Sequence, residues 1–346
     1  MFDPGPGAST YYYPNGQSAR LMWIHDQTAG QTRLNVYGGM VAPYELTDAS
    51  EQSLVSDNTL PPADHTIPLI IEDKTFVPKD IALQDGRWNT SAWGAEGDLW
   101  FSHVYESLQD PDQLHGTNNV GRWYYGPLFW PIFPAAYPLP TGAYGDETIT
   151  PESYHDTPVV NGVAYPTLEI DPTTYRFKVL NASVDRHLTI NLFVGKAAAK
   201  LADGTTVTNP FGIASEVDMV QATAPLVADA CAETATRPTP IGTTGKYCYP
   251  AHWPMDSRAG GVVAPSAAGP TMYQIANEGG WLPKVAAIDP SPTLYNTDKG
   301  RITIFNVEGP ALVLTPAERA DLVIDFSAYA GKTLLLYNDA GAPEPG

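Results

Sequence analysis

The feature that most constrains the fold is a series of short segments in which apolar and polar residues alternate. In residues 175–180, Tyr175, Phe177 and Val179 alternate with Arg176 and Lys178. Successive side chains of a β-strand point to opposite faces, so this period of two predicts a strand. The other expected strands are 33–37, 67–72, 187–193, 301–307, 321–326 and 333–337, with one short helix expected near 197–202.

Turn-forming residues separate these segments. The chain has 30 glycines and 33 prolines among its 346 residues. That density favours many short strands joined by turns over long helices. The pattern predicts an all-β protein built as a sandwich or a barrel.

Composition along the chain predicts three zones. Residues 1–50 contain the strand pattern at 33–37, and residues 51–66 are polar and proline-containing, as expected of a linker. Residues 67–342 read as one β domain with long insertions at 74–156 and 196–272. The first insertion is rich in aromatic residues. It could form a binding surface, but we favour an ordered loop packed over the sandwich, because such rings are usually buried.

Charge and missing motifs exclude several classes of function. The 38 acidic and 19 basic residues give a net charge of −19, which disfavours nucleic acids and anionic membrane surfaces as partners. No run of 18 apolar residues could span a membrane, and the first residues show no signal-peptide pattern. Phosphate-binding loops, a nucleophile elbow and a helical zinc motif are also absent from the sequence.

Several blocks resemble one known family. Residues 21–40 include His25-Asp26-Gln27, residues 277–283 read NEGGWLP, and residues 314–326 read LTPAERADLVIDF. Residues 65–76, 160–170 and 175–183 match in the same order. Together they resemble multicopper oxidases, in the branch that contains bilirubin oxidase, spore-coat laccase and phenoxazinone synthase. The match covers the end of the first cupredoxin domain and all of the second.

The resemblance implies a cupredoxin-like Greek-key β-sandwich with long loop insertions, preceded by a partial cupredoxin domain at 1–50. It implies copper as cofactor and an extracellular or periplasmic location. The family oxidises phenols, aromatic amines or metal ions by single electrons and reduces O₂ to water.

The family's early His-x-His pair and late His-Cys-His motif have no counterpart in this sequence. We therefore expect a fragment or subunit that lacks most copper ligands and is inactive alone. A partner chain or further domains would then supply the ligands. The alternative is a copper-free cupredoxin scaffold used for binding or self-assembly.

His25 is the candidate metal ligand that the resemblance implies. In the family, two histidines separated by one residue reach the copper cluster from this segment, but here Gln27 holds the second position. Residues two apart on a strand share a face, so His25 and Gln27 are expected to point the same way and Asp26 away. An amide is a poor copper ligand, so a hydrogen-bonded histidine beneath Trp23 is the preferred interpretation.

A second candidate lies around Cys248. Cys248, His252 and Met255, with His187 as a further donor, resemble the ligand loop of small blue-copper proteins. Because the family is exported, we favour instead a Cys231–Cys248 disulfide that closes the second insertion.

The remaining candidates are expected to have surface or structural roles. Surface or structural roles are expected for four histidines without ligand spacing, and a solvated face is expected for an acidic cluster. Asn89 and Asn181 begin glycosylation sequons, and the second is expected to be structural. The histidines are His65, His103, His115 and His155, and the acidic cluster is Asp146, Glu147, Glu152 and Asp156.

Overall fold

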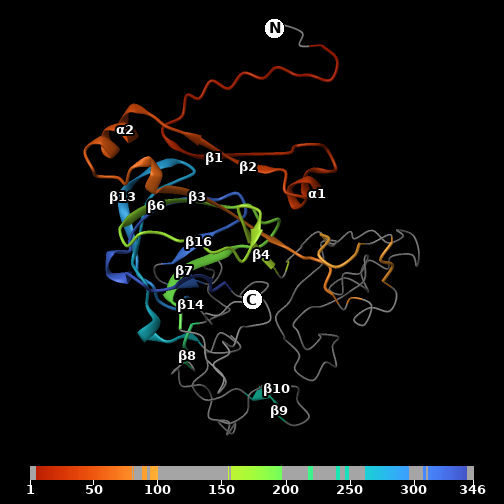
Figure 1. Ribbon diagram of the computed structural model, residues 1–346, viewed down its shortest axis with the longest axis vertical. Helices are drawn as coiled ribbons and strands as arrows, with labels where there is room; N and C mark the ends of the chain where they lie inside the picture. The colour runs from red at the N-terminus through yellow and green to blue at the C-terminus, as the bar shows by residue number, and fades with distance from the viewer. Residues whose placement is uncertain are drawn as a thin grey trace.

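The computed structural model describes residues 5–79, 81, 88–91, 94–99, 155, 157–196, 217–220, 239–241, 246–248, 262–295, 307–308 and 311–340. Within these residues, strands dominate and the helices are short (Figure 1). The all-β prediction is confirmed.

The main body is a sandwich. In the described residues a seven-stranded sheet has the order β13-β12-β17-β6-β3-β4-β5, and a three-stranded sheet has the order β16-β7-β18. All pairings in both sheets are antiparallel except β3 with β6. The strands of these sheets are β3 (Thr66–Lys74), β4 (Thr157–Val160), β5 (Val163–Ala164), β6 (Thr174–Asn181), β7 (Leu188–Val194), β12 (Met272–Asn277), β13 (Gly280–Ile288), β16 (Leu312–Leu314), β17 (Arg319–Asp325) and β18 (Leu334–Asn338).

Smaller elements surround the sandwich. β1 and β2 pair with each other, as do β8 with β11, β9 with β10 and β14 with β15. These elements are β1 (Arg20–His25), β2 (Val41–Leu46), β8 (Met219–Val220), β9 (Thr239–Ile241), β10 (Lys246–Cys248), β11 (Val262–Val263), β14 (Leu294–Tyr295), β15 (Val307–Glu308), the α-helices α1 (Thr32–Tyr37) and α2 (Ala49–Ser56), and the 3₁₀ turns η1 (Ala63–His65), η3 (Pro265–Ala267) and η5 (Ser327–Tyr329).

The seven-stranded sheet is covered on both faces. Toward the three-stranded sheet, Tyr175, Phe177 and Val179 of β6 join Leu188 and Ile190 of β7 in one buried cluster. Toward the other face, β1 and β2 pack over the sheet (Figure 1). The apolar contacts on that face come from Leu21, Trp23, Val41, Ile70, Leu180 and Ala182.

The polar residues of β6 are buried under this second layer. Arg176 and Lys178 are each only 2% exposed. The Arg176 guanidinium donates to both carboxylate oxygens of Asp321 at 2.7 and 2.5 Å, and to Glu51 Oε1 of α2 at 2.7 Å. Lys178 Nζ lies 2.9 Å from Glu45 Oε2 of β2 and 3.4 Å from Glu51 Oε1. A buried cation needs a paired anion, so these contacts tie β2 and α2 to the sheet.

The expected strand at 33–37 is wrong, because Thr32–Tyr37 forms the helix α1. A pattern of five residues cannot separate a strand from a single helical turn, and here Val36 and Tyr37 are the buried members while Leu34 is exposed. Gly38 donates to Leu34 O, and Gly39 adopts a positive φ of 98° that ends the turn. Tertiary contacts of Tyr37, described below, hold this short helix in place.

The segment expected as a linker contains α2. Asp48 is its N-cap, accepting from Glu51 N at 2.8 Å and also from Ala19 N at 2.8 Å. These hydrogen bonds lower the pKa of Asp48. Asp48-x-x-Glu51 has the spacing of a helix-capping signal. The linker was predicted from the polar composition of the segment, which does not take this spacing into account.

Five of the other strand predictions agree with the structure. Those at 67–72, 175–180, 187–193, 321–326 and 333–337 are confirmed to within a few residues by β3, β6, β7, β17 and β18. Of the segment 301–307 only the last residue is described, and the helix near 197–202 lies outside the described residues.

A second buried polar cluster joins α1 to the sandwich. Asp73 Oδ2, at the end of β3, accepts from His155 N at 2.8 Å and from Arg186 Nε at 3.0 Å, and lies 3.4 Å from His155 Nδ1. The His155 ring stacks on Tyr37 at 4.5 Å. Tyr37 Oη in turn accepts from Thr75 N at 3.0 Å. His155 therefore has the structural role expected of it.

These contacts set the pKa of Asp73. Burial raises it, but the hydrogen bonds from His155 and the electrostatic interactions with His155 and Arg186 outweigh burial and lower the pKa from 3.8 to about 2. The ionised form is therefore the one that the folded protein stabilises.

We predict that Glu51→Ala lowers the free energy of unfolding by about 3 kcal/mol, because it removes a buried anion from Arg176 and Lys178. Glu45→Ala is the matched control. Its side chain is 34% exposed, against 6% for Glu51, and its loss should cost about 0–1 kcal/mol. Urea denaturation of the 346-residue protein measures both. Equal losses for the two variants would contradict the prediction.

We predict that Asp73 contributes stability that is present above about pH 4 and lost as the pH falls toward about 2, because its folded pKa is depressed. Asp73→Asn should remove about 2 kcal/mol at neutral pH and flatten the stability profile in that acid range. Thermal unfolding from pH 2 to 7 tests this, with the exposed Asp64→Asn as control. An acid profile identical to that of the wild type would refute the assignment.

Candidate functional site

His25 ends β1 at an exposed rim of the molecule. Its strand pairs with β2 in antiparallel register, which places His25 opposite Val41. Residues two apart on β1 face the same way, so His25 follows Leu21 and Trp23. Leu21 is buried against the sandwich, and the Trp23 and His25 rings lie 4.3 Å apart, tilted by 34°. The His25 imidazole therefore packs against the Trp23 indole. The sequence favoured a hydrogen-bonded histidine beneath Trp23.

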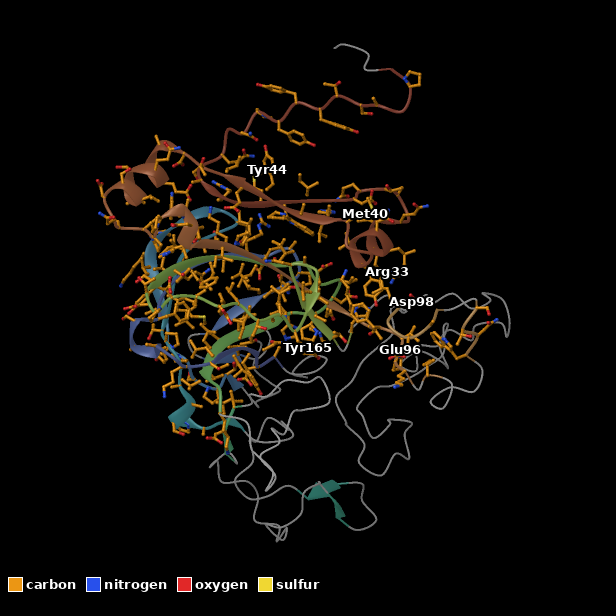
Figure 2. The ribbon with its side chains drawn as sticks, viewed as in Figure 1. Arg33, Met40, Tyr44, Glu96, Asp98 and Tyr165 are labelled. Atoms are coloured by element: carbon orange, nitrogen blue, oxygen red, sulfur yellow. The ribbon has the colours of Figure 1, made fainter. Side chains whose placement is uncertain are left out.

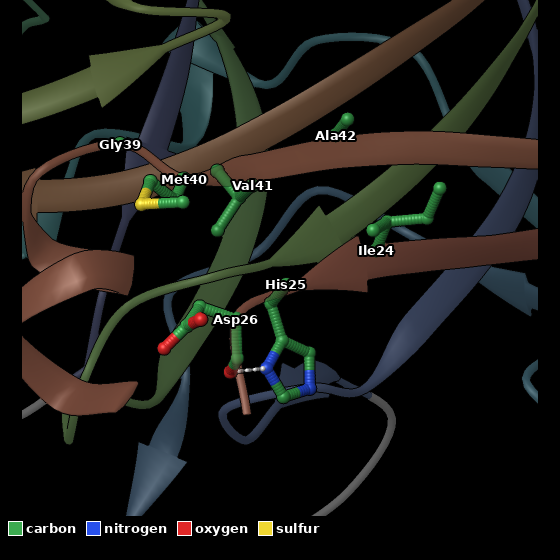
Figure 3. Close-up of a pocket in the computed structure, with 7 residues that line it drawn as sticks. All are labelled: Ile24, His25, Asp26, Gly39, Met40, Val41 and Ala42. Carbon is green, nitrogen blue, oxygen red and sulfur yellow. Dashed lines mark hydrogen bonds between the residues drawn. The ribbon is translucent and has the colours of Figure 1, made fainter. Parts of the chain in front are cut away.

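The loop after β1 is held by Asp26. The Asp26 carboxylate accepts from Thr28 Oγ1 at 2.6 Å, from Thr28 N at 2.9 Å and from Asn35 Nδ2 of α1 at 2.9 Å. The hydrogen bonds from Thr28 and Asn35 lower the pKa of Asp26. In Figure 3 the Asp26 carboxylate points away from the His25 ring. This confirms the expected direction of Asp26, although the strand has already ended at His25.

The side chains of Gln27 and His25 contact each other, although β1 ends at His25 and Gln27 lies in the loop that follows. Gln27 Nε2 lies 3.1 Å from His25 Nε2. His25 Nδ1 lies 2.8 Å from the backbone oxygen of Asp26 (Figure 3). Gln27 Nε2 is also 3.4 Å from His25 Nδ1, so the amide nitrogen lies near both ring nitrogens. The hydrogen bond from Asn35 to Asp26, nine residues away, had no signal in the sequence.

An open hollow adjoins this pair. Its lining is mostly apolar, and Ile24 and Met40 are 52% and 58% exposed. Met40 lies beside α1 in the side-chain view (Figure 2). The lining residues are Ile24, His25, Asp26, Gly39, Met40, Val41 and Ala42.

These residues do not by themselves fit copper. His25 offers one imidazole, and Gln27 offers a neutral amide, which copper binds poorly. Within the described part of the chain, no three His, Cys, Asp or Glu side chains are grouped so that they could hold a metal ion. His25 could serve as one ligand of a site completed from elsewhere.

The other candidates are not brought to His25. The His65 ring stacks on Tyr175 at 4.5 Å, and His187 is buried beside the start of β7. In the sequons, the Asn89 side chain accepts from Ser91 N, whereas Asn181 is fully buried and binds Arg186 O and Leu314 O. The structural role expected for Asn181 is thus supported.

Several predicted residues lie outside the described residues or have side chains that are not described. The blue-copper-like loop and the disulfide between Cys231 and Cys248 therefore stay predictions. The same holds for the aromatic segment 123–131 and for His103, His115, His252, Met255, Asp146, Glu147, Glu152 and Asp156.

Among known proteins, laccases align with nearly the whole chain. A laccase of Bacillus stratosphericus is 26% identical over 331 residues, which is 96% of this chain and 36% of the laccase. A laccase of Bacillus subtilis is 24% identical over the same share of this chain. Bilirubin oxidase of Albifimbria verrucaria is 38% identical over 93 residues, 26% of this chain and 15% of that protein.

Multicopper oxidases are among the solved structures that resemble this chain. McoA of Aquifex aeolicus is 15% identical with a TM-score of 0.42, over 93% of this chain and 37% of McoA. A laccase of Pediococcus acidilactici is 17% identical with a TM-score of 0.42, over 94% of this chain and 36% of that chain. No family model matches the sequence.

This chain spans about a third of the length of the laccases that it matches. In its described residues no helix is long and apolar enough to cross a membrane. The similarity to laccases extends over 96% of the chain, and the described residues form an all-β sandwich of the predicted kind. The chain is therefore similar to laccases over nearly its whole length, and to bilirubin oxidase over a shorter stretch.

Proposed function

We propose that this chain is a part or subunit of a copper-dependent oxidase and does not turn over substrate alone. The observation that carries this proposal is the donor set at the end of β1: one imidazole, His25, in contact with one amide, Gln27. The alignments cover only 36% of the length of the two Bacillus laccases. That share is consistent with further copper ligands from outside these residues.

The activity proposed for the complete assembly is the family reaction. Four single-electron oxidations of a phenol, an aromatic amine or a metal ion would supply the four electrons that, with four protons, convert one O₂ to two waters. Copper would supply the electron transfer, and His25 would contribute one ligand. An extracellular or periplasmic location is part of this proposal.

The role of this chain within the assembly is to hold His25 at a defined place. β1 is docked on the seven-stranded sheet by Leu21 and Trp23, and β2 is tied down by the Glu45–Lys178 pair. Such rigid support from packed strands is what a metal ligand requires for fixed geometry.

A copper-free scaffold is the second candidate, and the exposed aromatic surface over β2 favours it. Tyr11, Tyr12 and Tyr13 are 73%, 85% and 62% exposed. The Tyr13 ring lies 6.2 Å from that of Tyr44, whose hydroxyl donates to Asn15 (Figure 2). Exposed aromatic side chains of this kind are typical of contact surfaces.

We predict that the purified chain consumes no O₂ with a phenolic substrate and added Cu(II), whereas its native assembly contains copper and a partner with a His-Cys-His motif. Oxygen uptake, metal analysis and native mass spectrometry of the assembly measure this. Oxidase turnover by the 346-residue chain alone would overturn the proposal. A copper-free homo-oligomer would instead support the scaffold.

A further inference from the structure

The two glycosylation sequons of this chain share one local geometry. Asn89-Thr90-Ser91 and Asn181-Ala182-Ser183 are the two Asn-x-Ser/Thr tripeptides of the sequence. The backbone N–H of Ser91 donates to Asn89 Oδ1 at 3.0 Å, and that of Ser183 donates to Asn181 Oδ1 at 3.0 Å. In both, the asparagine oxygen is bound by the residue two positions on, as in an Asx turn. The motif and the local turn therefore do not distinguish the two sites.

The tertiary structure closes the site at Asn181. This residue ends β6 and is fully buried, and Ser183 is also buried. Asn181 Nδ2 donates to Arg186 O and to Leu314 O, each at 2.8 Å. An amide nitrogen carries two N–H groups, so both are used. A sugar on this nitrogen would displace a buried hydrogen bond and would have to enter the protein interior.

The same tripeptide is open at Asn89. Residues 89–91 are all exposed. They follow Trp88, which is buried in a small cluster with Val77 and Ile81. The Trp88 indole also donates to Gly94 O at 2.9 Å. The buried indole holds the base of this turn while the tripeptide faces solvent, so a bulky hydrophilic group on Asn89 would displace no core contact.

We propose that Asn89 is an attachment site for an N-linked glycan in the folded chain and that Asn181 is not. The donor is an oligosaccharide linked to a polyprenyl diphosphate. A new bond joins C1 of its first sugar to Asn89 Nδ2, and the bond from C1 to the diphosphate oxygen breaks. The diphosphate leaves with the electron pair, and Nδ2 gives one proton to a base of the transferase. The inference needs no copper, and in the cell it rests on the exported location proposed above.

Transfer to the folded chain tests this proposal. The purified 346-residue protein is incubated with an oligosaccharyltransferase and a polyprenyl-diphosphate oligosaccharide, and is then digested for peptide mass spectrometry. We expect the glycan on Asn89 and none on Asn181. An unmodified Asn89, or a glycan on Asn181 of the folded chain, would overturn the proposal.

The matched control removes the fold and keeps both sequons. Cleavage after lysine before the transfer places them in separate fragments, residues 80–178 and 179–196. Both fragments should then accept the glycan, because only the folded structure separates the two sites. Equal selectivity for Asn89 in the fragments and in the folded chain would contradict the role given to burial.

Two variants test the chemistry at Asn89. Ser91→Ala should abolish transfer to the folded chain and Ser91→Thr should preserve it, because the motif requires a hydroxyl two residues after the asparagine. Undiminished transfer to Ser91→Ala would refute the assignment. These measurements use no copper, partner chain or oxygen uptake. Failure here is therefore distinguishable from failure of the proposed oxidase role.

Discussion

The burial of two cations in the middle of β6 is the constraint on which the N-terminal layer depends. Arg176 and Lys178 point away from the sandwich core and must find anions where they are covered. Asp321 of the neighbouring strand supplies one from within the sheet, while Glu51 and Glu45 come from α2 and β2. The covering layer thus carries the charges that make its own docking favourable, and Trp281 adds a ring 5.4 Å from the Arg176 guanidinium.

This layer explains how the candidate ligand is presented. With β1 and β2 fixed on the sheet, the end of β1 leaves the covered region and His25 reaches an exposed rim beside the hollow. The neighbouring position holds an amide that hydrogen-bonds the imidazole. The resemblance implies a copper ligand in this segment, whereas one imidazole beside one amide does not by itself fit copper.

Sequence patterns predicted the sandwich strands well for a definite physical reason. In β6 and β7 one face of each strand lies in the common core, so the period of two survives in the sequence. The same reasoning failed at α1, where five residues were too few to separate the two periods and tertiary contacts of Tyr37 with His155 and Thr75 decided the outcome. At α2 the polar composition suggested a linker, although Asp48 and Glu51 carried a capping signal.

The sequence by itself determined the all-β class and the similarity to multicopper oxidases, because both depend on local order along the chain. Only the tertiary structure decided that both faces of the main sheet are covered and that the polar face of β6 is buried. It alone showed that Asn35 and Trp23 orient the Gln27–His25 pair. The physical reason is that Arg176 meets Glu51 across 125 residues and Asp321 across 145. No local pattern records partners that only the folded chain brings together.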